Sequence, residues 1–310
     1  LARDAASVVA HLIPAPSPSE MPGRCAAALR DLAVIRSGIV GAEGPAAARL
    51  QAIDALAAGI ERSASAATAL DRRLTALAAA AREMVHAMEF GFLIDPDVML
   101  FAIGYRMDDG ELDPGRYDLL ASEARLLSFV AIAKGDVPVR HWFRLGRLLT
   151  PAGRDSVLLS WSGSMFEYLM PGLVMRAPNG SVLEQSCRLA VERQITYGAE
   201  RGVPWGSSES GYYARNLEMT FQYSNFGVPG LGLRRGLADD VVVAPYATAL
   251  AAMFAPVAAV QNFGALARAG AEGRYGFYES VDYTRARLPV GATREVVQMY
   301  MAHHQGMTIV

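Results

Sequence analysis

Two patterns of hydrophobic and polar residues divide the chain near residue 89. From Gly44 to Met88 almost every residue is a strong helix former, and apolar residues recur at helical spacing. They are Leu50, Ile53, Leu56 and Ile60, and then Leu70, Leu74 and Leu77. Four prolines, at positions 14, 16, 18 and 22, precede this stretch and indicate a linker. We therefore interpret residues 1–85 as a Pro-rich linker and a helical hairpin that packs against or spaces other domains.

From Phe90 the pattern changes to short apolar segments separated by long loops rich in glycine and proline. It predicts helices at Tyr117–Lys134, Pro138–Leu148, Gly163–Met170, Ser181–Tyr197, Tyr212–Thr220, Tyr246–Met253, Val257–Ala269 and Thr293–Val310. Short strands are expected at Val98–Tyr105, Val157–Trp161, Val241–Ala244 and Gly276–Ser280. Helix pairs joined by long loops favour an all-α toroid over residues 86–310. Without long alternating strands, neither a Rossmann sheet nor a (β/α)8 barrel fits.

Composition places the chemistry in the second segment. All 26 aromatic residues of the 310-residue chain follow position 89. The formal net charge of −2 gives no basic excess, so a nucleic-acid partner is not expected. Cys25 and Cys187 are too few for a disulfide framework or a four-thiolate zinc site.

The ends of the chain and one apolar run bear on its location. The first residue is Leu1, and no basic start, apolar run and cleavage site follow it, so we expect a segment from inside a longer polypeptide. The uncharged run from Val241 to Val260 is long enough to span a bilayer, but Pro245 and Pro256 interrupt it. We interpret it as a strand end, a turn and a buried helix.

The sequence gives no indication of a cofactor or metal. The glycines at 230, 232 and 236 lack dinucleotide-binding spacing and a surrounding βαβ unit. His303 and His304 are adjacent, so on a helix they point about 100° apart and cannot chelate one ion together.

The remaining signal is a set of carboxylates embedded in aromatic and glycine-rich segments. Flat rings stack on the apolar faces of sugars, and carboxylates bind the hydroxyls. Cleavage of a glycosidic bond requires two carboxyl groups, one to protonate the leaving oxygen and one as nucleophile or base. The carboxylates concerned are Glu123, Glu167, Glu209, Glu279 and Asp282.

Each candidate also has a plain structural interpretation. Glu123 shares a predicted helix face with Leu119, Leu126 and Leu127, where desolvation would raise its pKa and suit it to be an acid. It could equally be a buried glutamate paired with Arg106 or Arg125. Glu209 could instead complement the dipole of a first helical turn. Trp161 and Trp205 are either sugar platforms or core residues.

Six motifs in order give the chain a family resemblance. They are W-S-G-S-M-F-E-Y-L-M-P (161–171), P-W-G-S-S-E-S (204–210), F-G-V-P-G-L-G-L-R-R-G-L (226–237), V-V-A-P-Y-A-T (242–248), G-R-Y-G-F-Y-E-S-V-D-Y-T (273–284) and M-A-H-H-Q-G-M (301–307). From about residue 90 onward the chain resembles the glycoamylase-like domain of bacterial cyclic β-1,2-glucan synthases. It is more distantly similar to endo-β-1,2-glucanases.

The resemblance implies an (α/α)6 toroid, here without its last helix, that acts on linear β-1,2-glucan. It implies Glu123 as acid/base and Glu209 as nucleophile of a retaining transglycosylation that closes rings, with Glu167 in reserve. The alternative is an inverting endo-β-1,2-glucanase. Glycine-rich loops at 226–236 and 273–276 are expected to close over the cleft. We expect substrate contacts from Asp118, Trp161, Glu167, Trp205, Tyr212, Tyr278, Glu279, Asp282, His303, His304 and Gln305.

The resemblance also implies partners and a location. A membrane glycosyltransferase domain of the same polypeptide would supply linear chains, and a phosphorylase-like domain would trim them. This domain would then be a soluble, cytoplasmic part of an inner-membrane protein. A stand-alone glucanase would instead be periplasmic.

Overall fold

The computed structural model describes residues 2–39 and 44–310. The chain forms two compact units, Leu1–Glu89 and Phe90–Val310. Each unit has its own hydrophobic core, and each is considered by itself.

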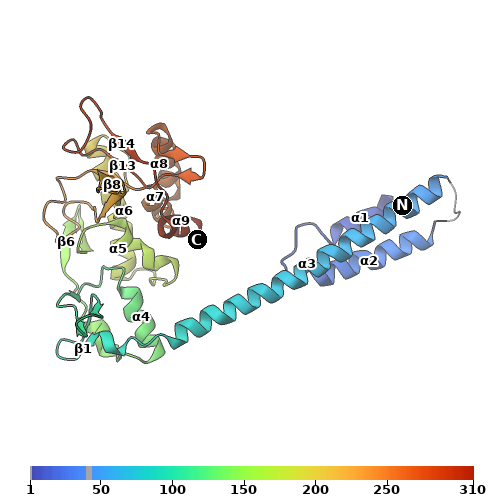
Figure 1. Ribbon diagram of the computed structural model, residues 1–310, viewed down its shortest axis with the longest axis horizontal. Helices are drawn as coiled ribbons and strands as arrows, with labels where there is room; N and C mark the ends of the chain where they lie inside the picture. Colours follow the sequence, from blue (N-terminus) through green and yellow to red (C-terminus); the bar gives the residue numbers. More distant parts are fainter. Residues whose placement is uncertain (1, 40–43) are drawn as a thin grey trace. The chain divides into compact units, whose positions relative to one another are not determined.

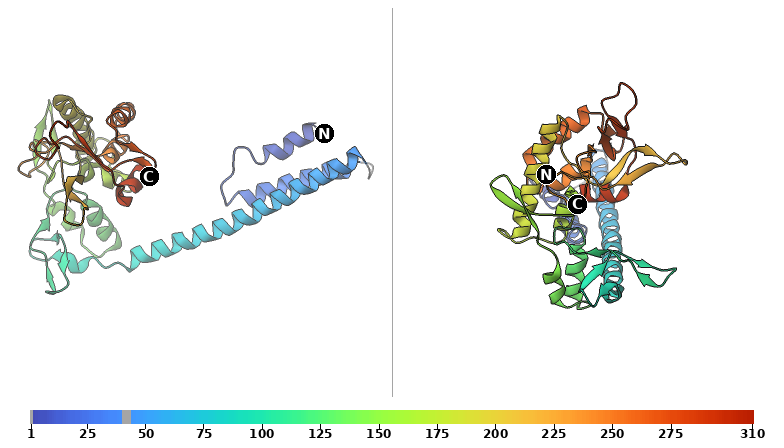
Figure 2. Two further views of the ribbon diagram at one scale, coloured as in Figure 1. Left: turned by 45° about the horizontal axis from the view of Figure 1, so that its top comes forward. Right: turned by 90° about the vertical axis from the view of Figure 1, so that its left-hand side faces the viewer.

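The first unit consists of three helices, α1 (Ala2–Ala10), α2 (Met21–Ser37) and α3 (Pro45–Ala87). The stretch of helix formers forms a single uninterrupted helix of 43 residues, and α2 packs along its N-terminal part (Figures 1 and 2). A small core of Val8, Cys25, Ala28, Leu32 and Ile60 joins the three helices.

The second unit contains six α-helices and three short 3-10 helices, all in the described part of the chain. The α-helices are α4 (Arg125–Lys134), α5 (Met165–Leu169), α6 (Val182–Arg201), α7 (Pro245–Ala251), α8 (Pro256–Arg268) and α9 (Ala302–Ile309). The 3-10 helices are η1 (Gly91–Leu93), η2 (Val139–Arg144) and η3 (Met170–Leu173). The main core lies where α5, α6 and α7 meet and includes Tyr168, Leu169, Val191, Tyr246 and Leu250.

Small antiparallel sheets fill the segments between these helices. The strands are β1 (Ile94–Asp95), β2 (Leu100–Ala102), β3 (Tyr105–Arg106), β4 (Glu111–Leu112), β5 (Arg116–Tyr117), β6 (Leu149–Ala152), β7 (Asp155–Leu158), β8 (Ser210–Arg215), β9 (Phe221–Ser224), β10 (Val242–Val243), β11 (Glu272–Gly273), β12 (Gly276–Phe277), β13 (Ser280–Asp282) and β14 (Glu295–Val297). They pair as β1-β2-β5, β10-β13-β14, β3-β4, β6-β7, β8-β9 and β11-β12. In Figure 1, β8, β13 and β14 lie together beside α7.

The predicted all-α toroid is therefore wrong. The described chain is 47% helix but also 15% strand, distributed over several small sheets. The expected helix Tyr212–Thr220 is the β8–β9 hairpin, whose turn is closed by the Asn216 side chain accepting the backbone N–H groups of Glu218 and Thr220. Such local side-chain bonds compete with helix formation.

Two further expected helices are shorter than predicted. The segment Tyr117–Lys134 becomes helical only at Arg125, and Thr293–Val310 begins as strand β14 before α9 starts at Ala302. In the second case the adjacent Val296 and Val297 pair with β13, as β-branched residues favour.

The apolar run Val241–Val260 forms strand β10, helix α7 and the first turns of α8, with Pro245 and Pro256 each starting a helix. Within the described parts of the chain, none of the helices combines the length and apolar character needed to cross a bilayer.

The glycine-rich loop 226–236 does not form a lid. It packs against residues 160–163, with backbone bonds from Leu233 to Ser160 (3.1 Å) and from Arg234 to Trp161 (2.8 Å). Val228 and Leu231 of this loop are themselves buried. A Cβ on Gly227 would lie 1.9 Å from the carbonyl oxygen of Ser162, so only glycine permits this approach.

We expect Gly227→Ala to lower the free energy of unfolding by about 3 kcal/mol, because the backbone of residues 162–163 cannot move away without breaking these bonds. Urea denaturation followed by tryptophan fluorescence measures this, since Trp142, Trp161 and Trp205 all lie in the second unit. Gly264→Ala, on α8 with only an ordinary contact at 3.5 Å, is the matched control and should not destabilise. Equal stability of the two variants would contradict the packing described.

Candidate active site

One cavity of about 440 Å³ gathers four of the predicted carboxylates, Asp118, Glu123, Glu167 and Glu209. Its volume falls in the usual range for small-molecule sites, about 300–1,000 Å³. Residues from four separate segments meet there. The lining comprises Ile103, Gly115, Arg116, Tyr117, Asp118, Leu119, Ser122, Glu123, Trp161, Ser162, Glu167, Glu209 and Asn225.

Glu123 lies in the turn directly before α4, rather than on a helix face. Ser122 shapes this turn by accepting the N–H of Ala124 and donating to the Glu123 carboxylate (both 3.1 Å). Burial raises the pKa of Glu123, and the negative charges of Glu167 and Glu209 add to the effect. The carboxyl group is therefore biased toward its protonated form.

Among the described residues, Glu123 forms no ion pair with Arg106 or Arg125, the two arginines considered as its partners. Arg106 instead pairs with Asp109 and Glu111. The guanidinium of Arg125 is buried and donates to the carbonyl oxygens of Ser122 (2.8 Å) and Glu167 (2.7 Å). Arg125 thereby ties the turn that carries Glu123 to helix α5.

Glu209 is half-buried and directly precedes strand β8. Its carboxylate accepts a hydrogen bond of 2.7 Å from the hydroxyl of Tyr223 on β9. Burial raises the pKa of Glu209, whereas the Tyr223 bond and the positive charges of His304 and His303 act in the opposite direction. Glu123 and Glu209 thus differ, because Glu209 has a short tyrosine donor and two neighbouring histidines that favour its charged form.

Glu167 is 6% exposed, and its carboxylate accepts six hydrogen-bond donors. Three are the backbone N–H groups of Trp161, Ser162 and Ser164, at 3.0–3.1 Å. The others are the hydroxyls of Ser160, Ser162 and Ser164, at 2.6–3.0 Å. Ser164 and Glu167 also form a capping box that starts α5. These donors occupy the lone pairs of the carboxylate.

The two candidate tryptophans lie in different environments. Trp161 lines the cavity with its side chain 54% exposed, which suits a sugar platform. Trp205 is 9% exposed and packs in the main core, where its backbone bonds the buried Asn262 side chain. Of the other expected contacts, Asp118 lines the cavity and is exposed.

The remaining predicted residues lie outside the cavity lining. Asp282 is fully buried and is bound by Arg287, whose guanidinium also stacks on Tyr212. Tyr278 packs on Tyr300, and the Gln305 amide donates to the carbonyl of Phe277. His303 is exposed with its ring edge toward Phe166. Glu279 and His304 are buried and bond to each other at 2.9 Å.

The structure adds residues that the sequence analysis missed. Tyr117 lines the cavity, and its pKa is raised by burial and then by the charges of Glu123 and Glu209. Asn225 also lines it, while Tyr223 binds Glu209. The only available signal was their position within or beside the aromatic motifs. Across residues 2–39 and 44–310, no three His, Cys, Asp or Glu side chains gather as metal ligands would.

Comparison with known proteins identifies the family of the chain that forms this cavity. Residues 116–310 match the Glycoamylase family, described as "Putative glucoamylase". The chain belongs to this family. All three cavity glutamates lie inside the matched segment.

One curated glycoamylase-family relative is informative. The chain is 51% identical over 241 residues to the cyclic beta-(1,2)-glucan synthase NdvB of Rhizobium meliloti (strain 1021). The aligned part covers 78% of this chain but only 8% of that protein. The resemblance predicted from the six motifs is therefore confirmed, and the chain corresponds to a small part of a much longer relative.

The contacts of Glu123 and Glu167 predict opposite effects of the same substitution on stability. Glu123→Gln should raise the free energy of unfolding at neutral pH, because it removes a charge that burial and two neighbouring carboxylates disfavour. The folded state holds the Glu123 proton to higher pH than the unfolded state does. The gain should therefore vanish at about pH 3, below the unfolded pKa of about 4.3, where both states are protonated.

Glu167→Gln should instead lower the free energy of unfolding by about 2–4 kcal/mol, because an amide NH₂ then faces backbone N–H groups that can only donate. Urea denaturation of both variants at the two pH values checks the pair of expectations. A destabilised Glu123→Gln at neutral pH would contradict the environment described for Glu123.

Proposed function

We propose that this chain is the part of a cyclic β-1,2-glucan synthase that acts on linear β-1,2-glucan by retaining transglycosylation and closes rings. The observation that carries the proposal is the joint placement of Glu123, Glu209 and the exposed Trp161 at one cavity, in a chain 51% identical to a protein of that name. Two carboxyls beside an aromatic platform are what glycosidic chemistry requires.

The environments of the two carboxyls support different roles. Glu123, whose pKa is raised by burial and which forms no ion pair with a described arginine, is suited to be the proton donor. Glu209, held by Tyr223 and two histidine charges, is suited to be the ionised nucleophile. We expect a bell-shaped pH dependence whose limbs report this coupled pair. Glu167 is fully engaged by the 160–164 loop, so we assign it a structural role.

The proposed reaction has two displacements. A Glu209 oxygen bonds to the anomeric carbon while the bond to the leaving sugar breaks, and the proton of Glu123 goes to the leaving oxygen. The 2-hydroxyl at the far end of the same chain then attacks that carbon. Its proton goes to Glu123, the ester bond breaks, and Glu209 regains its charge. Two inversions retain the β configuration and close a ring.

The long relative supports a wider setting for the domain. Since the chain aligns with 8% of NdvB, we propose that it works within one large polypeptide. A membrane-bound glycosyltransferase domain would supply linear glucan, and a phosphorylase-like domain would trim it. In this setting the domain would lie at the inner membrane on the cytoplasmic side.

The catalytic pair is tested by substitution. We expect Glu123→Gln and Glu209→Gln each to lower turnover of β-1,2-glucan by about 10³-fold or more while the fold is kept. Azide should restore turnover to Glu209→Ala and give an α-glucosyl azide, because one displacement inverts. Glu218→Gln, at an exposed glutamate in the β8–β9 turn, is the matched control. Normal turnover by Glu209→Gln, with a folded but inactive Glu167→Gln, would transfer the nucleophile role to Glu167.

The substrate and stereochemistry are tested by product analysis. Linear β-1,2-glucan should be converted to rings and chains of varied length, while cellulose, starch and laminarin remain unchanged, because their linkages present other ring faces. Proton NMR of the first product should show the β anomer. First release of the α anomer without rings would identify an inverting endo-β-1,2-glucanase instead. Equal turnover of a β-1,4- or α-1,4-glucan would overturn the substrate assignment.

A further inference from the structure

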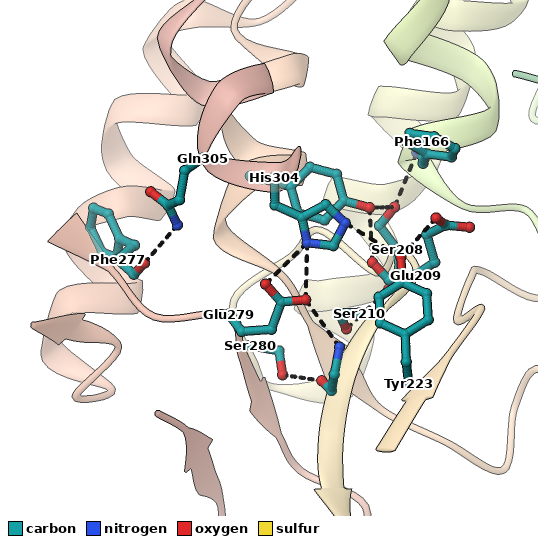
Figure 3. A network of polar contacts seen from close by, with 12 residues as sticks. Phe166, Ser208, Glu209, Ser210, Tyr223, Phe277, Glu279, Ser280, His304 and Gln305 are labelled. Atoms are coloured by element: carbon teal, nitrogen blue, oxygen red, sulfur yellow. Dashed lines mark hydrogen bonds and ion pairs between the residues drawn. The ribbon is translucent and has the colours of Figure 1, made fainter. Parts of the chain in front are cut away.

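A continuous chain of polar contacts runs from the core to the Glu209 carboxylate (Figure 3). Glu279, directly before β13, accepts the backbone N–H of Gly211 on β8 at 3.0 Å. His304 on α9 contacts Glu279 through Nδ1 at 2.9 Å. Its Nε2 faces the hydroxyl of Tyr223 at 3.4 Å, and that hydroxyl donates to Glu209 at 2.7 Å. We call Glu279, His304 and Tyr223 the Glu279 network.

The contacts of His304 suit a ring with protons on both nitrogens. An ionised Glu279 can only accept, so it calls for a proton on Nδ1. With the hydroxyl proton of Tyr223 directed to Glu209, the nearer partner, Nε2 can donate to the Tyr223 oxygen. We infer that His304 is an imidazolium ion paired with the Glu279 carboxylate.

The surroundings of His304 hold this arrangement in place. The ring of Tyr246 stacks on the His304 ring, with centroids 3.9 Å apart and planes 17° apart. The Tyr246 hydroxyl contacts Ser208 at 2.7 Å and donates to the backbone carbonyl of Glu209 at 2.9 Å. The same tyrosine therefore fixes both the imidazolium ring and the backbone of Glu209.

Burial excludes the direct substrate contact expected for two members of the network. Glu279 is 2% exposed and His304 1% exposed, so neither can reach a sugar. A buried ion pair costs desolvation energy without a clear gain in stability. The contact of this pair with Tyr223, and through Tyr223 with Glu209, points to a role in function instead.

We propose that the Glu279 network is a positioning device that keeps Glu209 ionised and oriented for attack; this rests on the proposed nucleophile role of Glu209. The imidazolium polarises the Tyr223 hydroxyl and makes it a stronger donor to the carboxylate. No proton has to move. The other titratable groups that interact electrostatically with Glu209 are Tyr117, Glu123, Glu167, Tyr246 and His303. All of them are kept in the variants described below.

The test is the pH profile of kcat/KM for three variants. Tyr223→Phe should move the acid limb to higher pH, because Glu209 loses the donor that favours its charge, and should lower kcat by about 10²-fold with little change in KM. Glu279→Gln should move the limb in the same direction by a smaller amount. The double variant should shift the limb by less than the sum of the two single shifts, because much of the effect of Glu279 on Glu209 passes through Tyr223.

Controls separate positioning from structural damage. Tyr213→Phe removes a hydroxyl from the same β8–β9 hairpin and should leave the profile unchanged. Unchanged acid limbs in the Tyr223 and Glu279 variants, or additive losses in the double variant, would overturn the proposal. Melting temperatures of all variants identify any loss that comes from unfolding.

A readout without turnover separates this proposal from the proposed function. Carbon-13 NMR of labelled glutamate, assigned with Glu209→Gln, follows the Glu209 titration directly. A higher pKa in Tyr223→Phe than in the unsubstituted protein supports the network even when no glucan is converted. Absence of activity on β-1,2-glucan in the unsubstituted protein would contradict only the proposed function. An unchanged Glu209 titration in Tyr223→Phe would contradict only the proposed role of the Glu279 network.

Discussion

The saturation of the Glu167 carboxylate is the constraint on which the site depends. One buried side chain organises the loop 160–164, starts helix α5 and sets the backbone that the loop 226–234 then packs against. The cavity face that presents Trp161 follows from this arrangement. Because α5 is also bound by Arg125 from the turn carrying Glu123, the same carboxylate indirectly locates the acid candidate. Removal of its charge would loosen several segments at once.

Placing three glutamates around one cavity opposes folding, and their surroundings differ. Glu167 is satisfied by donors and Glu209 by a tyrosine and nearby histidines, whereas burial raises the pKa of Glu123 and favours its protonated form. Such a division is typical of sites in which similar groups must take different protonation states. The stability lost at Glu123 is therefore a consequence of the function proposed for it.

The sequence predicted part of the cavity lining but not the architecture that forms it. Carboxylates beside aromatic residues pointed to Glu123, Glu209 and Trp161, all of which line the cavity. The reasoning for Glu123 assumed a helix that begins only at Arg125, so its burial arises from tertiary packing and not from helical spacing. Trp205 and Trp161 look alike in sequence, and only long-range contacts place one in the core. The four predicted short strands overlap β2, β7, β10 and β12. The β8–β9 hairpin was predicted as a helix, and most other strands, of two to four residues, leave almost no periodic signal.

The two sides of the cavity differ in how freely they can vary. On one side, the backbones of residues 160–163 and 226–232 approach so closely that side chains larger than hydrogen are excluded at Gly227 and Gly232. On the other, Ile103 is half exposed and belongs to the short strand region 100–119. Substitutions that change the shape of the cavity are therefore better tolerated on the second side. The backbone of the first side would stay the same while residues on the second side change.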